Sequence, residues 1–127
     1  MKYYICVAGC RNYAETEEHY SFVASYLDYV LQNLKNQGEI VIIHGACRGV
    51  DLLGGRRYAR ERKYKCLEFP ADWNTYGNYA GPKRNAEMVS KSTHIVVFWD
   101  GKSKGTYNLI QNAKKAGKPL KIKIIDI

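Results

Sequence analysis

Five short apolar runs alternate with polar or amphipathic segments along the chain. The runs cover residues 3–8, 39–44, 64–69, 94–99 and 120–127. Each is rich in Val, Ile, Tyr or Phe and is mostly continuous rather than alternating with polar residues. This pattern is typical of parallel strands that are buried on both faces.

The segments between these runs have the spacing of helices. In residues 15–37, apolar side chains such as Val23, Leu27 and Leu34 recur with a helical period, and Gly38 provides a helix stop. Three more helices are predicted over about 50–62, 82–91 and 106–116. The long segment 70–81 is expected to be an irregular loop.

Strands that alternate with helices form right-handed crossovers and a parallel sheet. We therefore predict an α/β fold: a Rossmann-like, three-layer domain with a mostly parallel five-stranded sheet and helices on both faces. A length of 127 residues fits a single domain over 1–127.

Composition narrows the functional classes. No apolar run is long enough to cross a membrane, and the first residues lack the features of a signal peptide, so we expect a cytoplasmic protein without a membrane partner. The four cysteines form no CxxC pair and are expected to be reduced thiols. We expect no metal site and no resident cofactor.

The formal net charge of +8 attracts polyanions such as nucleotides or nucleic acid. Many of the lysines lie in the last quarter of the chain, where a solvated helix face explains them equally well.

Three glycine-rich turns follow predicted strands, at the edge where ligands of open parallel sheets bind. They are "AGCRNY" after the first strand, "HGACRGVD" after the second and "DGKSKGT" after the fourth. Their glycines leave room for phosphate beside backbone N–H groups and helix N-termini, and arginines add forked hydrogen bonds. None is a Walker A or GxGxxG motif. The candidate ligand-binding residues are Gly9, Cys10, Arg11, Gly45, Ala46, Arg48, Gly49, Arg84, Asn85, Gly101, Gly105 and Thr106.

Two charged residues are candidates for catalysis. Arg84 lies near the expected start of a helix, where the dipole disfavours cations, so we expect it to face an anion. Asp51 has two open interpretations, a group that favours the start of its helix and a catalytic carboxylate.

Three aromatic residues of the 70–81 segment, Trp73, Tyr76 and Tyr79, are suited to stacking on a nucleobase. Covering the sheet edge, or forming a dimer contact, is an equal alternative. His44 is interpreted as a structural histidine.

Five blocks of the sequence lie in the predicted elements and turns described above: "ICVAGCRNY", "IIHGACRGVD", "EFPADW", "GPKRNAEM" and "HIVVFWDGKSKGT". Together, and in this order, they resemble the signature blocks of the YspA-like branch of the SLOG superfamily. The relatives of that branch include the Lonely Guy phosphoribohydrolases and the DNA-processing protein DprA. The resemblance implies a Rossmann-like domain whose glycine-rich edge binds a nucleotide or a nucleotide derivative. It also implies pairing through helices, and hence a homodimer.

The similarity to the Lonely Guy enzymes is only partial at the catalytic positions. Arg84, Asn85 and Met88 match their arginine block, and Gly101, Gly105 and Thr106 match part of their PGGxGTxEE block. Asn108 and Leu109 stand where those enzymes have glutamates that assist cleavage of an N-glycosidic bond. Asp51 or Asp100 would have to supply the carboxylate.

Three hypotheses follow, in order of preference. The first is a module that binds a nucleotide-like small molecule without cleaving it. The second is an N-glycosidic nucleotide hydrolase in which Arg84 binds phosphate and Asp51 is the acid or nucleophile. The third is single-stranded nucleic-acid binding, which the charge and the loop aromatics suggest.

Overall fold

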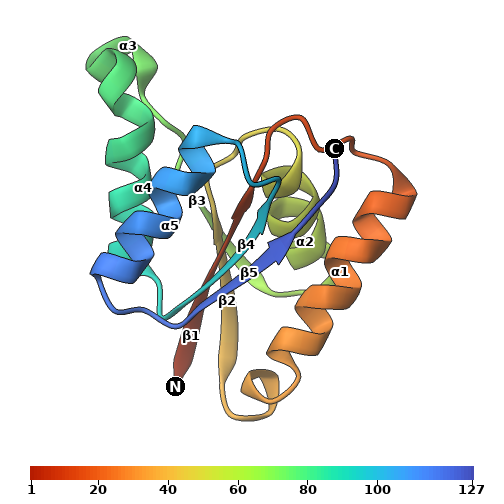
Figure 1. Ribbon diagram of the computed structural model, residues 1–127. Coiled ribbons are helices and arrows are strands. Elements are labelled where there is room, and N and C mark those ends of the chain that lie inside the picture. Colours follow the sequence, from red (N-terminus) through yellow and green to blue (C-terminus); the bar gives the residue numbers. More distant parts are fainter.

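Five parallel strands form one sheet in the order β3-β2-β1-β4-β5 (Figure 1). Every neighbouring pair is parallel, which confirms the predicted α/β class. The strands are β1 (Lys2–Gly9), β2 (Glu39–His44), β3 (Lys65–Glu68), β4 (His94–Trp99) and β5 (Leu120–Ile124). The computed structural model describes all residues, 1–127.

Helices cover both faces of this sheet. One face is covered by α1 (Glu17–Leu31) and by a continuous helical stretch made of η2 (Asp51–Arg57) and α2 (Tyr58–Arg62), and the other by α4 (Ala80–Lys91) and α5 (Lys104–Lys115) (Figure 1). The short elements are η1 (Leu34–Asn36), α3 (Trp73–Tyr76) and η3 (Gly77–Tyr79). None of these helices has the length and apolarity that a membrane crossing requires.

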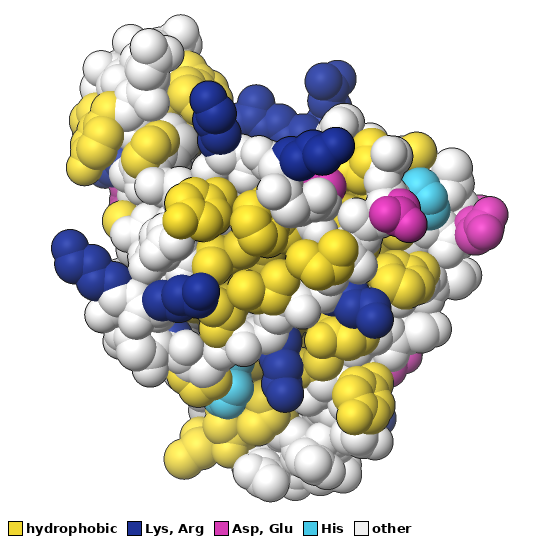
Figure 2. Space-filling model, viewed as in Figure 1, with side chains coloured by type: hydrophobic (Ala, Val, Ile, Leu, Met, Phe, Trp, Pro, Cys, Tyr) yellow, Lys and Arg dark blue, Asp and Glu magenta, His cyan; other side chains and the backbone are white.

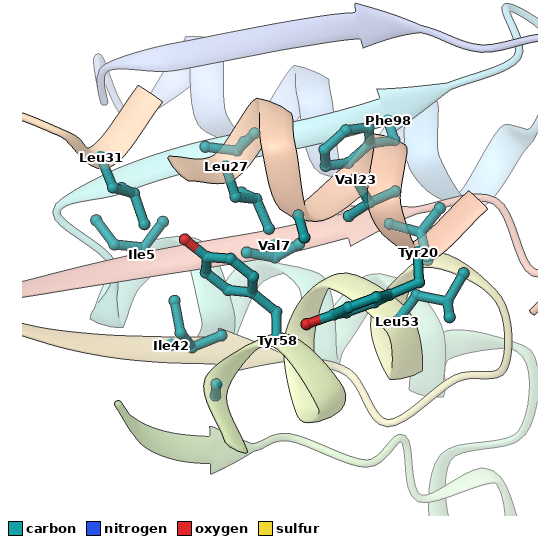
Figure 3. Close-up of a cluster of buried hydrophobic side chains, with 14 of the residues drawn as sticks. Ile5, Val7, Tyr20, Val23, Leu27, Leu31, Ile42, Leu53, Tyr58 and Phe98 are labelled. Carbon is teal, nitrogen blue, oxygen red and sulfur yellow. The ribbon is translucent and has the colours of Figure 1, made fainter. Parts of the chain in front are cut away.

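Strand β1 is buried on both faces and so separates two apolar clusters. Ile5 and Val7 pack with Leu27, Tyr58 and Phe98 under α1 and α2 (Figure 3). The alternate residues of β1 pack on the other side, against α4 and α5. Complete burial of an apolar side chain contributes about 1.5–3 kcal/mol, so both faces contribute to stability.

The predicted helix over 50–62 is present, but its first half is wound as a π-helix. Two adjacent glycines bring this segment close to the sheet. A Cβ at Gly54 would lie 2.9 Å from Val7 Cγ1 of β1, and a Cβ at Gly55 would lie 2.6 Å from His44 Cβ of β2. Any larger residue would push the segment off β1 and β2.

Several predicted boundaries were wrong. The first helix ends at Leu31 rather than near residue 37, because a 3-10 turn leads Gly38 to pack on the Met1 carbonyl and to enter β2. Helices α4 and α5 each begin two residues earlier than expected. The 70–81 segment is not irregular, since it contains α3 and η3.

The strand order reverses between β1 and β4, where the chain crosses from one face of the sheet to the other. The carboxyl ends of both strands lie at the same edge, with the helix starts around them (Figure 1). In open parallel sheets this switch point is the usual place for a ligand.

Candidate functional site

A cavity of about 540 Å³ opens at this switch point. Its wall combines the end of β1, the turns after β2 and β4, and the starts of α3, α4 and α5. The lining residues are Ala8, Gly9, Arg11, Asn12, Cys47, Asp51, Trp73, Gly81, Pro82, Arg84, Asn85, Met88, Ser103, Lys104, Gly105, Thr106, Asn108 and Leu109. Its size lies in the range of small-molecule sites.

The turn after β2 is closed by its own carboxylate. Asp51 Oδ2 accepts the N–H groups of Gly45 at 3.1 Å and of Cys47 at 3.4 Å. A Cβ at Gly45 would lie 3.0 Å from Asp51 Oδ2 and would also collide with Arg84 Nη1. Gly45 therefore makes room for two side chains of the protein, where we had expected it to make room for a ligand.

Two other N–H groups of this turn are also bonded internally. The Ala46 N–H donates to His44 Nδ1 at 3.0 Å, and the Gly49 N–H donates to Glu15 Oε2 at 3.0 Å. Gly49 adopts a positive φ of 81° and packs on the backbone of the turn after β1. These donors are satisfied without a phosphate.

Burial dominates the titration of Asp51. It raises the pKa of this carboxyl to about 6, although the Arg84 charge and the N–H groups of Cys47 and Gly45 lower the pKa. Asp51 is only 5% exposed, yet it lines the cavity. Its carboxyl thus changes charge near neutral pH, which is the range that acid or base chemistry requires.

Arg84 is buried and donates mainly to backbone carbonyls. Nη1 lies 2.7 Å from Gly45 O and 3.3 Å from Phe69 O, and Nε donates to Asn85 Oδ1 at 3.1 Å. Both terminal nitrogens also lie 3.7 Å from Cys47 Sγ. Since α4 begins at Ala80, Arg84 lies beyond the first residues of the helix, and its guanidinium holds the turn after β2 against α4.

The turn after β4 differs because its helix start is open. Helix α5 has no side-chain cap, and no protein acceptor bonds the N–H groups of Lys104, Gly105 or Thr106. Thr106 is 8% exposed, lines the cavity, and its hydroxyl bonds no other group of the protein. Such a helix end carries a partial positive charge and attracts anions.

Asp100 shapes this turn without closing it. Its Oδ1 accepts the N–H groups of Lys102 at 2.9 Å and of Ser103 at 2.8 Å. These bonds hold the pKa of Asp100 at about 2. Asp100 does not line the cavity, and a carboxylate that is permanently ionised and already bonded is a poor acid.

An amide bridge joins the two helices that form one wall of the cavity. Asn85 Nδ2 of α4 donates to Gly105 O at 3.1 Å and to Asn108 Oδ1 at 3.0 Å on α5. Asn85 Oδ1 accepts from Arg84. The bridge thereby links the turn after β2, which Arg84 holds, to the turn after β4.

Of the residues predicted to bind the ligand, the cavity brings together Gly9, Arg11, Arg84, Asn85, Gly105 and Thr106, with Asp51 beside them. The other six predicted residues do not line the cavity: Cys10, Gly45, Ala46, Arg48, Gly49 and Gly101. Of these, Arg48 is exposed to solvent. The sequence interpretation missed Cys47, Ser103 and Lys104, although all three stand inside the glycine-rich turns.

Cationic side chains gather along the rim of this edge of the sheet (Figure 2). The upper rim in that view corresponds to the carboxyl ends of the strands in Figure 1. Over the rest of the visible face, Lys and Arg are scattered between apolar side chains. The positive charge at this rim attracts anions.

His44, Cys66 and Glu68 place ligand-type atoms within 4.8 Å of one another at the β2–β3 edge. His44 Nδ1 accepts the Ala46 N–H, so the ring proton resides on Nε2. That nitrogen lies 3.1 Å from Glu68 Oε2, in contact even though the angle does not make a good hydrogen bond. A nitrogen that carries a proton has no lone pair for a metal, so the arrangement favours a neutral structural histidine.

Comparison with known proteins places this chain among relatives. The family model described as "YspA, cpYpsA-related SLOG family" matches residues 4–76. The chain belongs to this SLOG family. It is also 35% identical over 86 residues to the Gene 61 protein of Mycobacterium phage D29, covering 64% of this chain and 69% of that protein.

Among solved structures, the SLOG chain is similar to the X-ray structure of TM1055, a Northeast Structural Genomics Consortium target. The TM-score is 0.69 at 18% identity, and the match covers 93% of this chain and 72% of that one. This likeness supports the Rossmann-like arrangement of the whole chain, including α4 and α5, which lie beyond the matched segment of the family model.

The positions at which this SLOG protein departs from the Lonely Guy pattern lie in the cavity wall. Asn108 and Leu109 both line the cavity, and Asn108 Oδ1 is bonded by Asn85 and by Asn112 Nδ2 at 3.2 Å. An amide in this place is neutral and already bonded. Asp51 is the one carboxylate in the lining of the cavity.

Proposed function

We propose that this protein binds a nucleotide or nucleotide-derived small molecule in the cavity, with a phosphate at the N-terminus of α5. The observation that carries the proposal is the contrast in N–H groups: those of Gly45, Ala46, Cys47 and Gly49 in the turn after β2 are bonded internally, while those of Lys104, Gly105 and Thr106 are free. The unbonded Thr106 hydroxyl and the Lys104 ammonium add a donor and a charge in the same wall.

Isothermal titration calorimetry tests this proposal. The panel contains nucleoside mono- and diphosphates, cyclic dinucleotides and ADP-ribose, with the unphosphorylated nucleosides as controls. We expect heat from at least one phosphorylated member and none from its nucleoside. Absence of heat from every member at low salt would contradict the proposal. A single-stranded oligonucleotide that binds more tightly than every mononucleotide would favour nucleic acid instead.

One observation favours a second function, hydrolysis of an N-glycosidic bond. Asp51 lines the cavity with a pKa near 6, so a fraction of it is protonated near neutral pH. As an acid it would give its proton to the leaving base while water attacks the anomeric carbon, releasing the free base and a sugar phosphate. The assay measures free base, and Asp51→Asn must abolish its release while nucleotide binding persists.

A further inference from the structure

A half-exposed tryptophan is held in the wall of the cavity. Trp73 begins α3, which Asp72 caps by accepting the Thr75 N–H at 3.1 Å. The indole lies against the start of α4, where a Cβ at Gly81 would come within 3.2 Å of Trp73 Cη2. Trp73 nevertheless remains 48% exposed and lines the cavity. A large apolar ring is thus fixed in position but not covered.

Arg11, on the turn after β1, extends over the face of this ring. Its guanidinium carbon lies 5.8 Å from the ring centroid. This distance lies at the outer end of the range of a cation–π contact, which is about 6 Å. Arg11 is exposed, forms no ion pair with an acidic side chain and lines the same cavity. The guanidinium therefore lies over the indole, and both side chains are accessible from the cavity.

These two side chains suit a flat aromatic group, because aromatic rings and guanidinium groups are the side chains on which nucleobases stack. A base would stack on the exposed face of the indole, and the exposed Arg11 side chain would rotate to cover the other face of the base. Both side chains share the cavity with the start of α5, whose first N–H groups are free.

We infer that Trp73 and Arg11 clamp a nucleobase, so that the ligand is a nucleoside phosphate and not a base-free sugar phosphate. This inference rests on the proposed function, because the phosphate at α5 brings the ligand into the cavity. It also gives Arg11 a stacking role, where the sequence had suggested a phosphate contact.

Calorimetry with two ligand classes tests the clamp: the four common nucleoside 5′-monophosphates, and ribose 5-phosphate. We expect Trp73→Ala to weaken nucleotide binding about five- to 150-fold and to leave ribose 5-phosphate binding unchanged. Trp73→Phe should retain most of the affinity. Tyr79→Ala is the matched control, because Tyr79 lies in the neighbouring η3, is 62% exposed and does not line the cavity.

Fluorescence at saturating ligand provides a readout of the environment of Trp73 itself. The chain has two tryptophans, and Trp99 is held by Ser103 O and Tyr107. A base stacked on Trp73 should quench the emission, whereas ribose 5-phosphate should not, and Trp73→Phe should remove the quenching. Circular dichroism confirms that each variant is folded.

The outcomes separate the two proposals. If ribose 5-phosphate binds as tightly as the nucleotides, or if Trp73→Ala weakens both equally, the clamp is wrong and the phosphate site stands. If neither ligand class binds to the wild type and the whole nucleotide panel gives no heat, the proposed function fails and the clamp fails with it.

Discussion

Two glycine-rich turns at the same sheet edge differ in whether their backbone N–H groups are already bonded within the protein. The turn after β2 bonds its N–H groups to Asp51, His44 and Glu15. The turn after β4 uses Asp100 to order its backbone but leaves the first N–H groups of α5 free. The difference shows that glycine content does not distinguish these two turns, whereas the side chains that fold back onto them decide which N–H groups are already bonded.

The largest effect should follow from removing the Asp51 carboxyl group from the turn after β2. Asp51→Ala removes the acceptor of the Gly45 and Cys47 N–H groups, whereas Asp51→Asn keeps an oxygen in that place. Both variants are neutral, so ionisation cancels between them. We expect Asp51→Ala to be less stable than Asp51→Asn by on the order of 2–5 kcal/mol in urea unfolding, because two buried donors lose their acceptor. Equal stability would show that the turn is not held by this oxygen.

The next effect is a dependence of stability on pH. Burial raises the pKa of Asp51 to about 6, so the folded state binds a proton more tightly than the unfolded state does. The contribution of Asp51 to stability is therefore fully present below the ordinary aspartate pKa of about 4. It is lost as pH rises to about 6, a change of about 3 kcal/mol.

The free energy of unfolding of the wild type relative to Asp51→Asn measures this change, because the other titrating groups cancel. The wild type should lose stability relative to the variant between about pH 4 and 6 and remain level above it. A difference that is constant with pH would refute a buried, readily protonated Asp51.

A carboxylate introduced at the start of α5 should remove nucleotide binding. Gly105→Asp places a carboxylate at the start of α5, where a Cβ meets no atom within 4 Å. The carboxylate would bond the free N–H groups and repel a phosphate. We expect nucleotide affinity to fall by about 100-fold or more while folding is retained. The neutral variant Gly105→Asn has a similar size and should lose much less, and equal losses would indicate a steric effect alone.

The smallest of these effects concerns a single hydroxyl. Thr106→Val removes a hydroxyl that has no partner in the protein and keeps the shape of the side chain. One lost hydrogen bond to a charged phosphate should weaken nucleotide binding about tenfold. Thr106→Ser restores the hydroxyl and should restore affinity. Unchanged binding by Thr106→Val would place the phosphate elsewhere in the cavity.

Much of the fold was predictable because strands buried on both faces have continuous apolar runs. The bounds of β2 and β4 were predicted correctly, as were the parallel sheet and the helices on both faces. The π-wound η2 was not predictable, since it depends on how Gly54 and Gly55 meet Val23 and His44, which lie far away in the sequence. The short helices α3 and η3 were missed because so few residues have no apolar period.

The candidate site was only partly predictable for the same reason. The glycine turns located the correct edge, and Arg84, Asn85, Gly105 and Thr106 do line one cavity. Cys47 and Lys104 were missed because neither residue type marks a binding site without its surroundings. Asp51 begins η2, as one interpretation expected, and it also lines the cavity, so its catalytic role stays a prediction.

The sequence by itself determined the alternation of strands and helices, the edge at which the glycine turns meet and the absence of glutamates at Asn108 and Leu109. Tertiary structure decided which turn is open. Arg84 comes from α4 to hold the turn after β2, and Asp51 folds back into it, while nothing folds into the start of α5. Local patterns set each backbone conformation, but only contacts between distant segments determine which hydrogen-bond donors remain for a ligand.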